Sequence, residues 1–394
     1  MPDISIPCVL YRGGTSRGLL FLETDLPYPR EVLSPILLRA FGSPDTRQID
    51  GAGGATSLTS KAMIVGRHPG SDADVRMLFA QVGVAAPTVD FGGNCGNMTA
   101  AVGPFAIEAG LVAASEPITV VRIRSVNTGV TVHAHVPVCN GRVMTEGDFA
   151  IAGVPGTAAR LDLEWLRPGG ALTGRLLPTG RPRDEFVLSD GRRIEVSIVD
   201  AGNASVFCAA SSLGLTGTEL PAAIEQNGDA MRALEEIRSI TGELLGIVRS
   251  RADATRTSPG LPKVAFVAPP SDYRTTTGEP LPAGSHDVQA RLMSMQTAHR
   301  TYAAAGSITT SVAARIPGTV VFECVSGASG DRGHVRIAHP GGVMDVGIDM
   351  GGTAAEPEVR SATVPRTARR IMSGEVWIPN LPSSIRPAAP DDPR

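Results

Sequence analysis

A run of apolar residues with helical spacing follows the turn at residues 92–98 and extends to Leu111. Its apolar side chains recur every three or four positions, and the opposite face of the expected helix is also largely apolar. The two sets of positions are Met98, Ala101, Val102, Phe105, Ala106 and Ala109, and then Ala100, Ile107 and Leu111. A helix that is apolar on nearly every side is buried. We therefore expect it to thread the middle of a domain, with at least a kink at Pro104.

Residues 306–318 repeat this pattern, because Gly306 and Ser307 can cap a short apolar helix that a proline and a glycine then end. Roughly two hundred residues separate the two copies, and we interpret the repeat as evidence of a duplicated α+β domain. The other expected helices are residues 30–41, one opened by Pro221, one from Asp229 to about residue 245, and residues 287–302. The expected strands are residues 6–11, 19–22, 62–65, 75–82, 118–125, 130–138, 194–199, 205–209, 319–324 and 375–378.

The composition is typical of a globular protein of two or three domains, since 394 residues with 42% hydrophobic side chains can form a sizeable core. A net charge of -3 gives no basic surface, and four tyrosines and two tryptophans leave few rings for stacking on bases. Nucleic acid is therefore not an expected partner.

The five cysteines are odd in number and widely scattered, with no C-x-x-C pair. They indicate neither a disulfide framework nor a cysteine zinc site, and a reducing compartment fits them. The first residues lack a basic start followed by an apolar segment, and no apolar run reaches the roughly eighteen residues of a membrane span. We expect a cytoplasmic protein without a membrane segment.

Cys95 is the first candidate for chemistry, because it precedes the buried helix directly. The first-turn N–H groups of a helix have no internal partners and favour negative charge, whether a thiolate or a substrate carboxylate. A small buried hydrophobe is the commoner role of a cysteine. The flanking Asn94, Gly96 and Asn97 favour a functional role, which could be that of a nucleophile, a thiolate sensor or an acid–base group.

Two loops near the N-terminus supply further candidates. Residues 12–18 form a hairpin-like turn whose side chains Arg12, Thr15, Ser16 and Arg17 could donate hydrogen bonds to an anion. Residues 48–61 fit neither the phosphate-loop pattern nor the dinucleotide pattern G-x-G-x-x-G. They form a small-residue loop that delivers Lys61, although most lysines are solvated surface charges.

Six motifs together resemble the PrpF family of methylaconitate and methylitaconate isomerases, and the likeness covers roughly residues 4–380. They are RGGTSRG at 12–18, QIDG at 48–51, TSK at 59–61, GNCGN at 93–97, GVPGT at 153–157 and RIPGT at 315–319. The resemblance implies the diaminopimelate epimerase-like fold, an α+β fold of two similar domains, each a curved sheet around a central helix. It places the active site in the cleft between the domains. We expect the first domain at residues 1–184, completed by a strand near 374–380, the second at 185–373 and a disordered tail at 381–394.

The resemblance also implies the chemistry, since family members shift a carbon–carbon double bond by moving a proton between two carbons. The matched Lys61 and Cys95 are then the acid–base groups. At pH 7, reference pKa values put neutral lysine at a cost of roughly 4.6 kcal/mol and the cysteine thiolate at roughly 2 kcal/mol. The deprotonated, basic form of Cys95 is therefore easier to form at pH 7. Lys61 is the stronger base, but burial or cationic neighbours must first lower its pKa.

We assign Lys61 as the proton-shuttling base and Cys95 as a second acid–base or positioning group, without a cofactor or metal. Helix-end N–H groups are expected to stabilise the enolate-like intermediate. The expected substrate-binding residues are Arg12, Thr15, Ser16, Arg17, Ser60, Asn94, Gly96, Asn97, Ser307, Thr309 and Thr310.

The chain departs from related racemases, which use one cysteine from each domain. At the second-helix position this chain has Thr309 and Thr310, and Cys208 and Cys324 fall in expected strands. Amino-acid epimerisation is therefore disfavoured. Arg17 stands where the family more often has lysine, which keeps the charge but changes the hydrogen-bond geometry.

The expected activity is isomerisation of an unsaturated di- or tricarboxylate such as 2-methylaconitate, 3-methylitaconate or aconitate. Two alternatives are a 4-oxalomesaconate tautomerase and a non-catalytic accessory protein of an aconitase-like dehydratase. A cysteine hydrolase is disfavoured because neither His299 nor His339 lies in a dyad setting. His299, Lys263 and the pair at 127–128 resemble family segments, but each can equally be a structural hydrogen-bonding group. A homodimer is possible.

Overall fold

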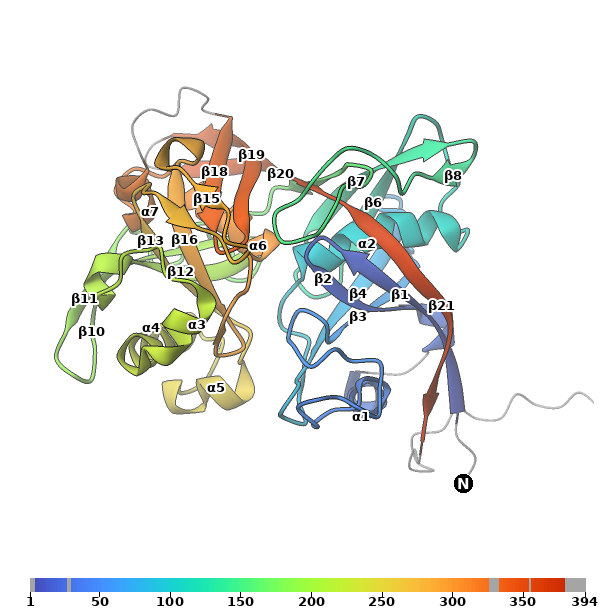
Figure 1. Ribbon diagram of the computed structural model, residues 1–394, viewed down its shortest axis with the longest axis horizontal. Helices are drawn as coiled ribbons and strands as arrows, with labels where there is room; N and C mark the ends of the chain where they lie inside the picture. The colour runs from blue at the N-terminus through green and yellow to red at the C-terminus, as the bar shows by residue number, and fades with distance from the viewer. Residues whose placement is uncertain (1–3, 27–29, 326–332, 354–355, 380–394) are drawn as a thin grey trace, which may run out of the picture.

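The computed structural model describes residues 4–26, 30–325, 333–353 and 356–379, which form two lobes side by side (Figure 1). Strands β1 to β8 lie in one lobe with helices α1 and α2, and strands β10 to β19 lie in the other with α3 to α7. Strand β20 bridges them, because it pairs with β19 on one side and with β9 on the other. β21 then returns to the first lobe and pairs with β1.

The two lobes repeat one order of strand pairing. In the first lobe β1 is antiparallel to β2, β2 parallel to β3, β3 antiparallel to β4, β4 parallel to β6, and β6 antiparallel to β7. The same alternation runs through β11, β12, β13, β16, β18 and β19 in the second lobe. The predicted duplication and the α+β fold class are therefore confirmed.

The strands of the first lobe and of the crossover are β1 (Ile4–Gly13), β2 (Ser16–Leu22), β3 (Lys61–Arg67), β4 (Val75–Val82), β5 (Val89–Asp90), β6 (Ile118–Ser125), β7 (Thr131–Cys139), β8 (Arg142–Val143), β9 (Leu161–Leu166), β20 (Pro357–Arg366) and β21 (Ala368–Ile378). Those of the second lobe are β10 (Asp184–Val187), β11 (Arg193–Ala201), β12 (Asn203–Ala209), β13 (Lys263–Ala268), β14 (Tyr273–Arg274), β15 (Pro280–Leu281), β16 (Val288–Ser294), β17 (Thr297–Ala298), β18 (His334–His339) and β19 (Gly342–Gly352).

Each lobe is built around one buried helix, as the apolar patterns predicted. In α2 (Gly96–Glu108) every residue from Gly96 to Ala106 is buried, and in α6 (Ala304–Ala313) every residue is buried. The N-termini of the two helices meet at Gly96. A Cβ atom there would lie 2.8 Å from the Ala304 Cβ atom and 3.1 Å from the Ala305 nitrogen, so this contact requires glycine.

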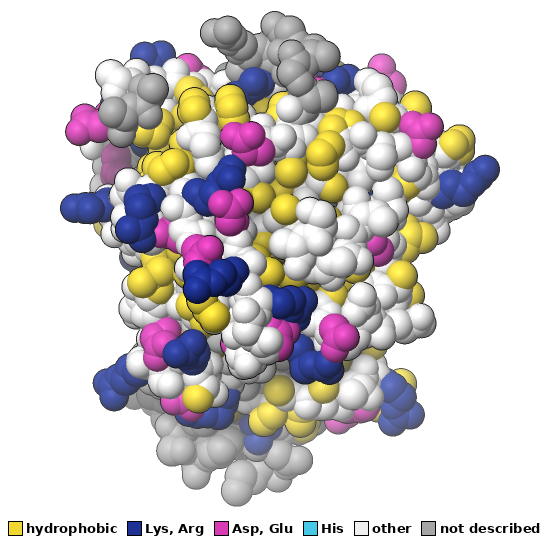
Figure 2. All heavy atoms as spheres, turned by 90° about the vertical axis from the view of Figure 1, so that its left-hand side faces the viewer, with side chains coloured by type: hydrophobic (Ala, Val, Ile, Leu, Met, Phe, Trp, Pro, Cys, Tyr) yellow, Lys and Arg dark blue, Asp and Glu magenta, His cyan; other side chains and the backbone are white. Residues whose placement is uncertain are grey.

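The remaining helices are α1 (Arg30–Phe41), α3 (Pro221–Gln226), α4 (Gly228–Leu244), α5 (Ala254–Thr257) and α7 (Val320–Cys324), with 3₁₀ turns at Glu23–Asp25, Ala210–Leu213, Arg251–Asp253 and Ala283–Ser285. Helices α1, α3 and α4 pack on the outer faces of the sheets, whereas α7 packs with α6 in the core of the second lobe. None of the helices in the described part of the chain combines the length and the apolar character that a membrane crossing requires. On the outer face of the second lobe, Figure 2 shows basic and acidic side chains intermingled.

Two predicted elements were wrong. Residues 287–302 form β16 and β17, because nearly all of Val288–Ser294 is buried on both faces and spacing alone does not distinguish such a strand from a helix. Residues 319–324 form α7 rather than a strand, since the Thr319 hydroxyl accepts from the Phe322 N–H. Cys324 therefore lies in a helix, whereas Cys208 lies in β12 as expected.

The helix predicted to be capped by Gly306 and Ser307 begins earlier, at Ala304, so both residues lie inside its first turn. Its N-cap is Ala303, which offers no side-chain hydrogen bond, and the sequence therefore carries no cap signal there. The predicted tail at residues 381–394 lies outside the described residues.

Candidate active site

A narrow cavity of about 50 Å³ lies between the two lobes, at the N-termini of α2 and α6. Its first-lobe lining includes the polar side chains of Ser16, Lys61, Gln81, Asp90, Asn94, Cys95 and Asn97. Its second-lobe lining includes Asn203, Lys263, Ser294, His299 and the run Ala303, Ala304 and Ala305. Two larger cavities, of about 680 and 520 Å³, lie nearby, but neither is lined by Lys61 or Cys95.

Cys95 is the N-cap residue of α2, as the turn around it predicted. Its Sγ atom accepts from the Met98 N–H at 3.5 Å, and the thiol is half-buried in the cavity wall. This contact places the sulfur at the N-terminal end of the helix, where the backbone N–H groups face the cavity.

Lys61 is the first residue of β3 and is only 6% exposed. Its ammonium group donates to Oε1 of Gln81, the residue directly opposite on β4, and lies 5.5 Å from the centre of the Phe79 ring. The lysine thus has a neutral partner where most buried lysines have a carboxylate. Burial lowers the pKa of Lys61, and negative charge on Cys95 acts in the opposite direction.

Three backbone carbonyls fix the orientation of the Gln81 amide. Its Nε2 atom donates to the oxygens of Ser57 at 3.1 Å, Ser60 at 3.0 Å and Val82 at 3.3 Å. A flipped amide would place its oxygen against all three carbonyls, so Oε1 must face Lys61. Gln81 can therefore accept from the lysine but cannot donate to it.

The second lobe brings a second lysine to the same cavity. Lys263 is the first residue of β13, and it stands opposite Ser205 of β12 as Lys61 stands opposite Gly18 of β2. Burial, followed by the positive charge of Lys61, lowers the pKa of Lys263 to about 8, while Asp90 and Cys95 act in the opposite direction.

The duplication explains further pairs of lining residues. Ser16 and Asn203 open the equivalent strands β2 and β12, two residues before Gly18 and Ser205. The cross-strand partner of Lys61 is Gln81, and continuing the β13–β16 register from Ala265 opposite Leu292 places Ser294 opposite Lys263. The equivalent of Cys95, as helix N-cap, is Ala303. The two walls of the cavity are thus related in backbone but differ in chemistry.

His299 is a neutral hydrogen-bond donor at the second-lobe wall. Its Nδ1 atom accepts from the Thr301 N–H at 3.1 Å, so the proton of the neutral ring resides on Nε2. Burial and the charges of Lys61 and Lys263 lower the pKa of His299 to about 3, which keeps the ring uncharged at neutral pH. An uncharged donor can stabilise a developing oxyanion.

Three buried oxygens in the lining have no hydrogen-bond partner among the described residues: Ser16 Oγ, Asn94 Oδ1 and Asn203 Oδ1. Most buried polar atoms in proteins are paired, and a cluster of unpaired ones indicates a place for a polar ligand. The Ser16 hydroxyl can also donate, which suits a carboxylate.

Of the predicted binding residues, Ser16, Asn94, Gly96 and Asn97 line this cavity. Thr15 lies behind them: Asn97 Nδ2 donates to its hydroxyl at 3.1 Å, and that hydroxyl lies 3.0 Å from the Thr301 hydroxyl of the other lobe. Asn97 Oδ1 also accepts from Arg366 Nε at 3.0 Å.

The structure does not bring the remaining predicted binding residues to the cavity. Arg12 donates to the carbonyls of Gly14 and Thr367, Ser60 donates to Gln48 and the Thr56 carbonyl, and Arg17 lies beside Gly54. These side chains shape the loops around the cavity instead.

Ser307, Thr309 and Thr310 also point away from the cavity. Their hydroxyls bond backbone carbonyls of their own helix, and Thr309 additionally bonds Ala201 and Asn203. The second-lobe helix therefore faces the cavity with alanines, and the structure does not bring the predicted Ser307, Thr309 and Thr310 to it.

Gln81, Asp90, Asn203, Lys263 and Ser294 were not predicted as site residues. A signal existed for Lys263, since each lysine follows a small-residue or proline turn and opens an apolar strand. Within the described residues, no three His, Cys, Asp or Glu side chains group closely enough to hold a metal ion.

The sequence of the chain was compared with known protein families and with individual proteins, and it matches both. A family model described as PrpF protein matches residues 3–379. The chain is 44% identical to the 3-methylitaconate isomerase of Eubacterium barkeri, covering 95% of this chain and 98% of that protein. It is 38% identical to the 2-methyl-aconitate isomerase of Cupriavidus necator, with 96% and 98% covered, and 39% identical to the 4-oxalomesaconate tautomerase of Pseudomonas putida, with 96% and 97% covered.

Solved structures give the same result for the fold. The crystal structure of methylitaconate-delta-isomerase superposes with a TM-score of 0.78 at 42% identity over the whole of both chains. A hydroxyproline epimerase from Agrobacterium vitis superposes with a TM-score of 0.55 at 13% identity, covering 95% of this chain and 93% of that one, which shows a shared fold.

Proposed function

This chain belongs to the PrpF family and is an isomerase, and we propose that it moves a carbon–carbon double bond within an unsaturated di- or tricarboxylate. The observation that carries the proposal is the cavity at the two helix N-termini, which holds a buried lysine without a carboxylate partner beside a cysteine. The candidate substrates are 2-methylaconitate, 3-methylitaconate and aconitate, after the names of the relatives.

In the proposed reaction Lys61 is the base. Its neutral amine removes a proton from the carbon next to the carboxylate-bearing double bond, and the electron pair spreads over the allyl system and the carboxylate as an enolate. The lysine then returns the proton two carbons away. Burial and the absence of a carboxylate partner both favour the neutral amine that this role requires.

Cys95 and His299 assist from opposite walls. Cys95, at the head of α2, is a second acid–base or positioning group, and the helix N–H groups favour the negative charge of the intermediate. The Nε2–H of His299 is suited to donate to an enolate oxygen without competing for the transferred proton.

Tautomerisation of 4-oxalomesaconate is the second candidate, because a relative with that name is 39% identical over nearly its whole length. The same 1,3-proton transfer would serve both reactions. A non-catalytic accessory role is the third candidate, and the intact Lys61 and Cys95 argue against it.

The wider organisation is proposed with the function. Residues 1–184, completed by β21, would form the first domain, and residues 185–373 the second. The isomerase would work in the cytoplasm without a cofactor, on a small polycarboxylate, as a possible homodimer.

Proton NMR in deuterated water with a panel of these acids tests the proposal. The expected result is deuterium exchange at the two reacting carbons and movement of the double bond in at least one acid. Loss of turnover in Cys95→Ser with full retention in Lys61→Ala would reverse the two assigned roles. If no acid exchanges but one raises the melting temperature, the protein binds polycarboxylates without converting them.

A further inference from the structure

The second lysine of the cavity, Lys263, has no partner in the part of the chain that the structure describes. Among the described residues no group accepts a hydrogen bond from the Lys263 ammonium group or forms an ion pair with it. Asp90 is close enough to act on its charge, but one Asp90 oxygen accepts from the Gly92 N–H at 2.7 Å and the other lies against Gly260. A cation that is partly buried without a partner is costly, and an anionic ligand removes that cost.

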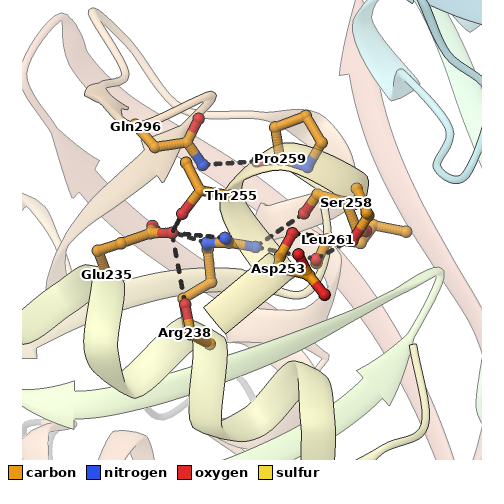
Figure 3. Close-up of polar contacts among 10 residues, drawn as sticks. Glu235, Arg238, Asp253, Thr255, Ser258, Pro259, Leu261 and Gln296 are labelled. Carbon is orange, nitrogen blue, oxygen red and sulfur yellow. Dashed lines mark hydrogen bonds and ion pairs between the residues drawn. The ribbon is translucent and has the colours of Figure 1, made fainter. Parts of the chain in front are cut away.

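Arg238 of α4 fastens the loop that precedes Lys263 (Figure 3). The Arg238 guanidinium donates to the carbonyls of Ser258 at 2.8 Å and Leu261 at 3.1 Å, and it pairs with Glu235 at 2.6 Å. These bonds fasten the loop that leads directly into Lys263 and lines the cavity at Gly260 and Leu261. The lysine thus starts from a fixed backbone, as a ligand-binding group requires.

Four charged or ionisable groups surround Lys263. They are Lys61 on β3, Asp90 on β5, Cys95 at the head of α2 and Arg238 on α4, and the neighbouring His299 is neutral. Two lysines face one cavity whose single lining carboxylate is already bonded. The balance is positive, which suits a ligand carrying at least two negative charges.

We propose that Lys263 binds the substrate carboxylate remote from the reacting carbons and thereby makes the enzyme select polycarboxylates over monocarboxylates. The duplicated fold supplies one lysine from each lobe, and their surroundings divide the roles: Lys61 is held by Gln81 for proton transfer, whereas Lys263 keeps all its donors for the ligand. This inference rests on the proposed isomerase function and adds a specificity-determining residue to it.

The test combines Lys263→Met with substrates that differ by one carboxylate. Steady-state rates are measured for the best acid of the panel and for its monoester at the carboxylate remote from the double-bond shift. Since a hydrogen bond to a charged group is lost, we expect Lys263→Met to raise KM for the acid about 10- to 100-fold and to change kcat much less. With the monoester, the wild type and Lys263→Met should differ less than about threefold, because the contact is already absent.

Lys263→Arg keeps the charge and is the matched control, with KM expected within about tenfold of the wild type. Thermal unfolding of all three proteins separates binding effects from loss of fold. If Lys263→Met does not fold, the comparison of Lys263→Arg with Lys263→Gln on both substrates replaces it. An unchanged KM for the acid, or an equal loss on acid and monoester, would overturn the proposal.

Failure of the proposed function gives a different result. In that case the wild-type enzyme converts no acid of the panel, and the test moves to the melting-temperature shift produced by aconitate itself. A shift in the wild type that Lys263→Met abolishes would then retain the binding role, and an equal shift in both proteins would reject it.

Discussion

Gln81→Glu is the substitution that tests most directly whether Lys61 acts as a neutral base. The substitution replaces the amide nitrogen of Gln81 by an oxygen, so the neutral acceptor beside Lys61 becomes a carboxylate of nearly the same shape. An opposite charge within about 4–6 Å raises the pKa of a lysine by roughly one to three units. At pH 7 the neutral fraction of Lys61 would therefore fall roughly 10- to 1,000-fold.

The measurement is the pH dependence of kcat. If neutral Lys61 removes the proton, kcat rises with pH through the pKa of the lysine, and Gln81→Glu should move this rise upward by roughly one to three pH units. At sufficiently high pH the variant should recover most of the wild-type kcat. Gln81→Met removes the acceptor without adding charge. Its kcat should fall, while the pH at which kcat rises should change little.

Gln289→Glu is a matched control at a distance from the cavity. Gln289 is also fully buried, and its amide also donates to a carbonyl, that of Ser271, but it does not line the cavity of Lys61. It should leave the pH profile unchanged. A Gln81→Glu enzyme with wild-type kcat and an unmoved profile would refute the role of Lys61 as a neutral base.

Three further outcomes are expected. Gly96→Ala places a methyl group 2.8 Å from the Ala304 Cβ atom, so it should destabilise the protein by about 1–3 kcal/mol in urea unfolding; unchanged stability would contradict the tight helix contact. Thr309→Val should cost about 1–2 kcal/mol of stability but leave KM unchanged, whereas a rise in KM would restore this threonine to the binding site. For Lys263 the folded pKa of about 8 lies below its ordinary value of 10.5, so the charged form is penalised in the folded state below pH 8. Lys263→Met should therefore stabilise the fold at pH 7, and this gain should shrink between pH 8 and 10.5; a gain independent of pH would point to packing instead.

The first lobe of the site could be predicted from the sequence because its signals are local. The turn at Asn94 to Asn97, the apolar run behind it and the loop before Lys61 each lie within a few residues of the group they position. A turn of small and polar residues before an apolar run marks the start of a buried helix, so these local patterns located the helix N-terminus and Cys95.

The site residues of the second lobe could not be predicted from local sequence patterns. Lys263 reaches the cavity because β12, β13 and β16 pair in a register that the local sequence does not encode. The start of α6 is marked by three alanines, which carry no capping group, so the sequence prediction placed the cap at Gly306 and Ser307 instead. The β16 residues are buried on both faces, which removes the alternation that identifies a strand.

The size of the cavity has a consequence for the speed of the enzyme. The cavity offers little accessible space, and its two walls belong to different lobes that touch at the Thr15–Thr301 contact. A substrate that contacts both walls would enter and leave most easily if the lobes part and return in each turnover, with loss of that contact. If this motion is slower than proton transfer, added viscogen should lower kcat, and deuterium at the transferred position should slow the enzyme little.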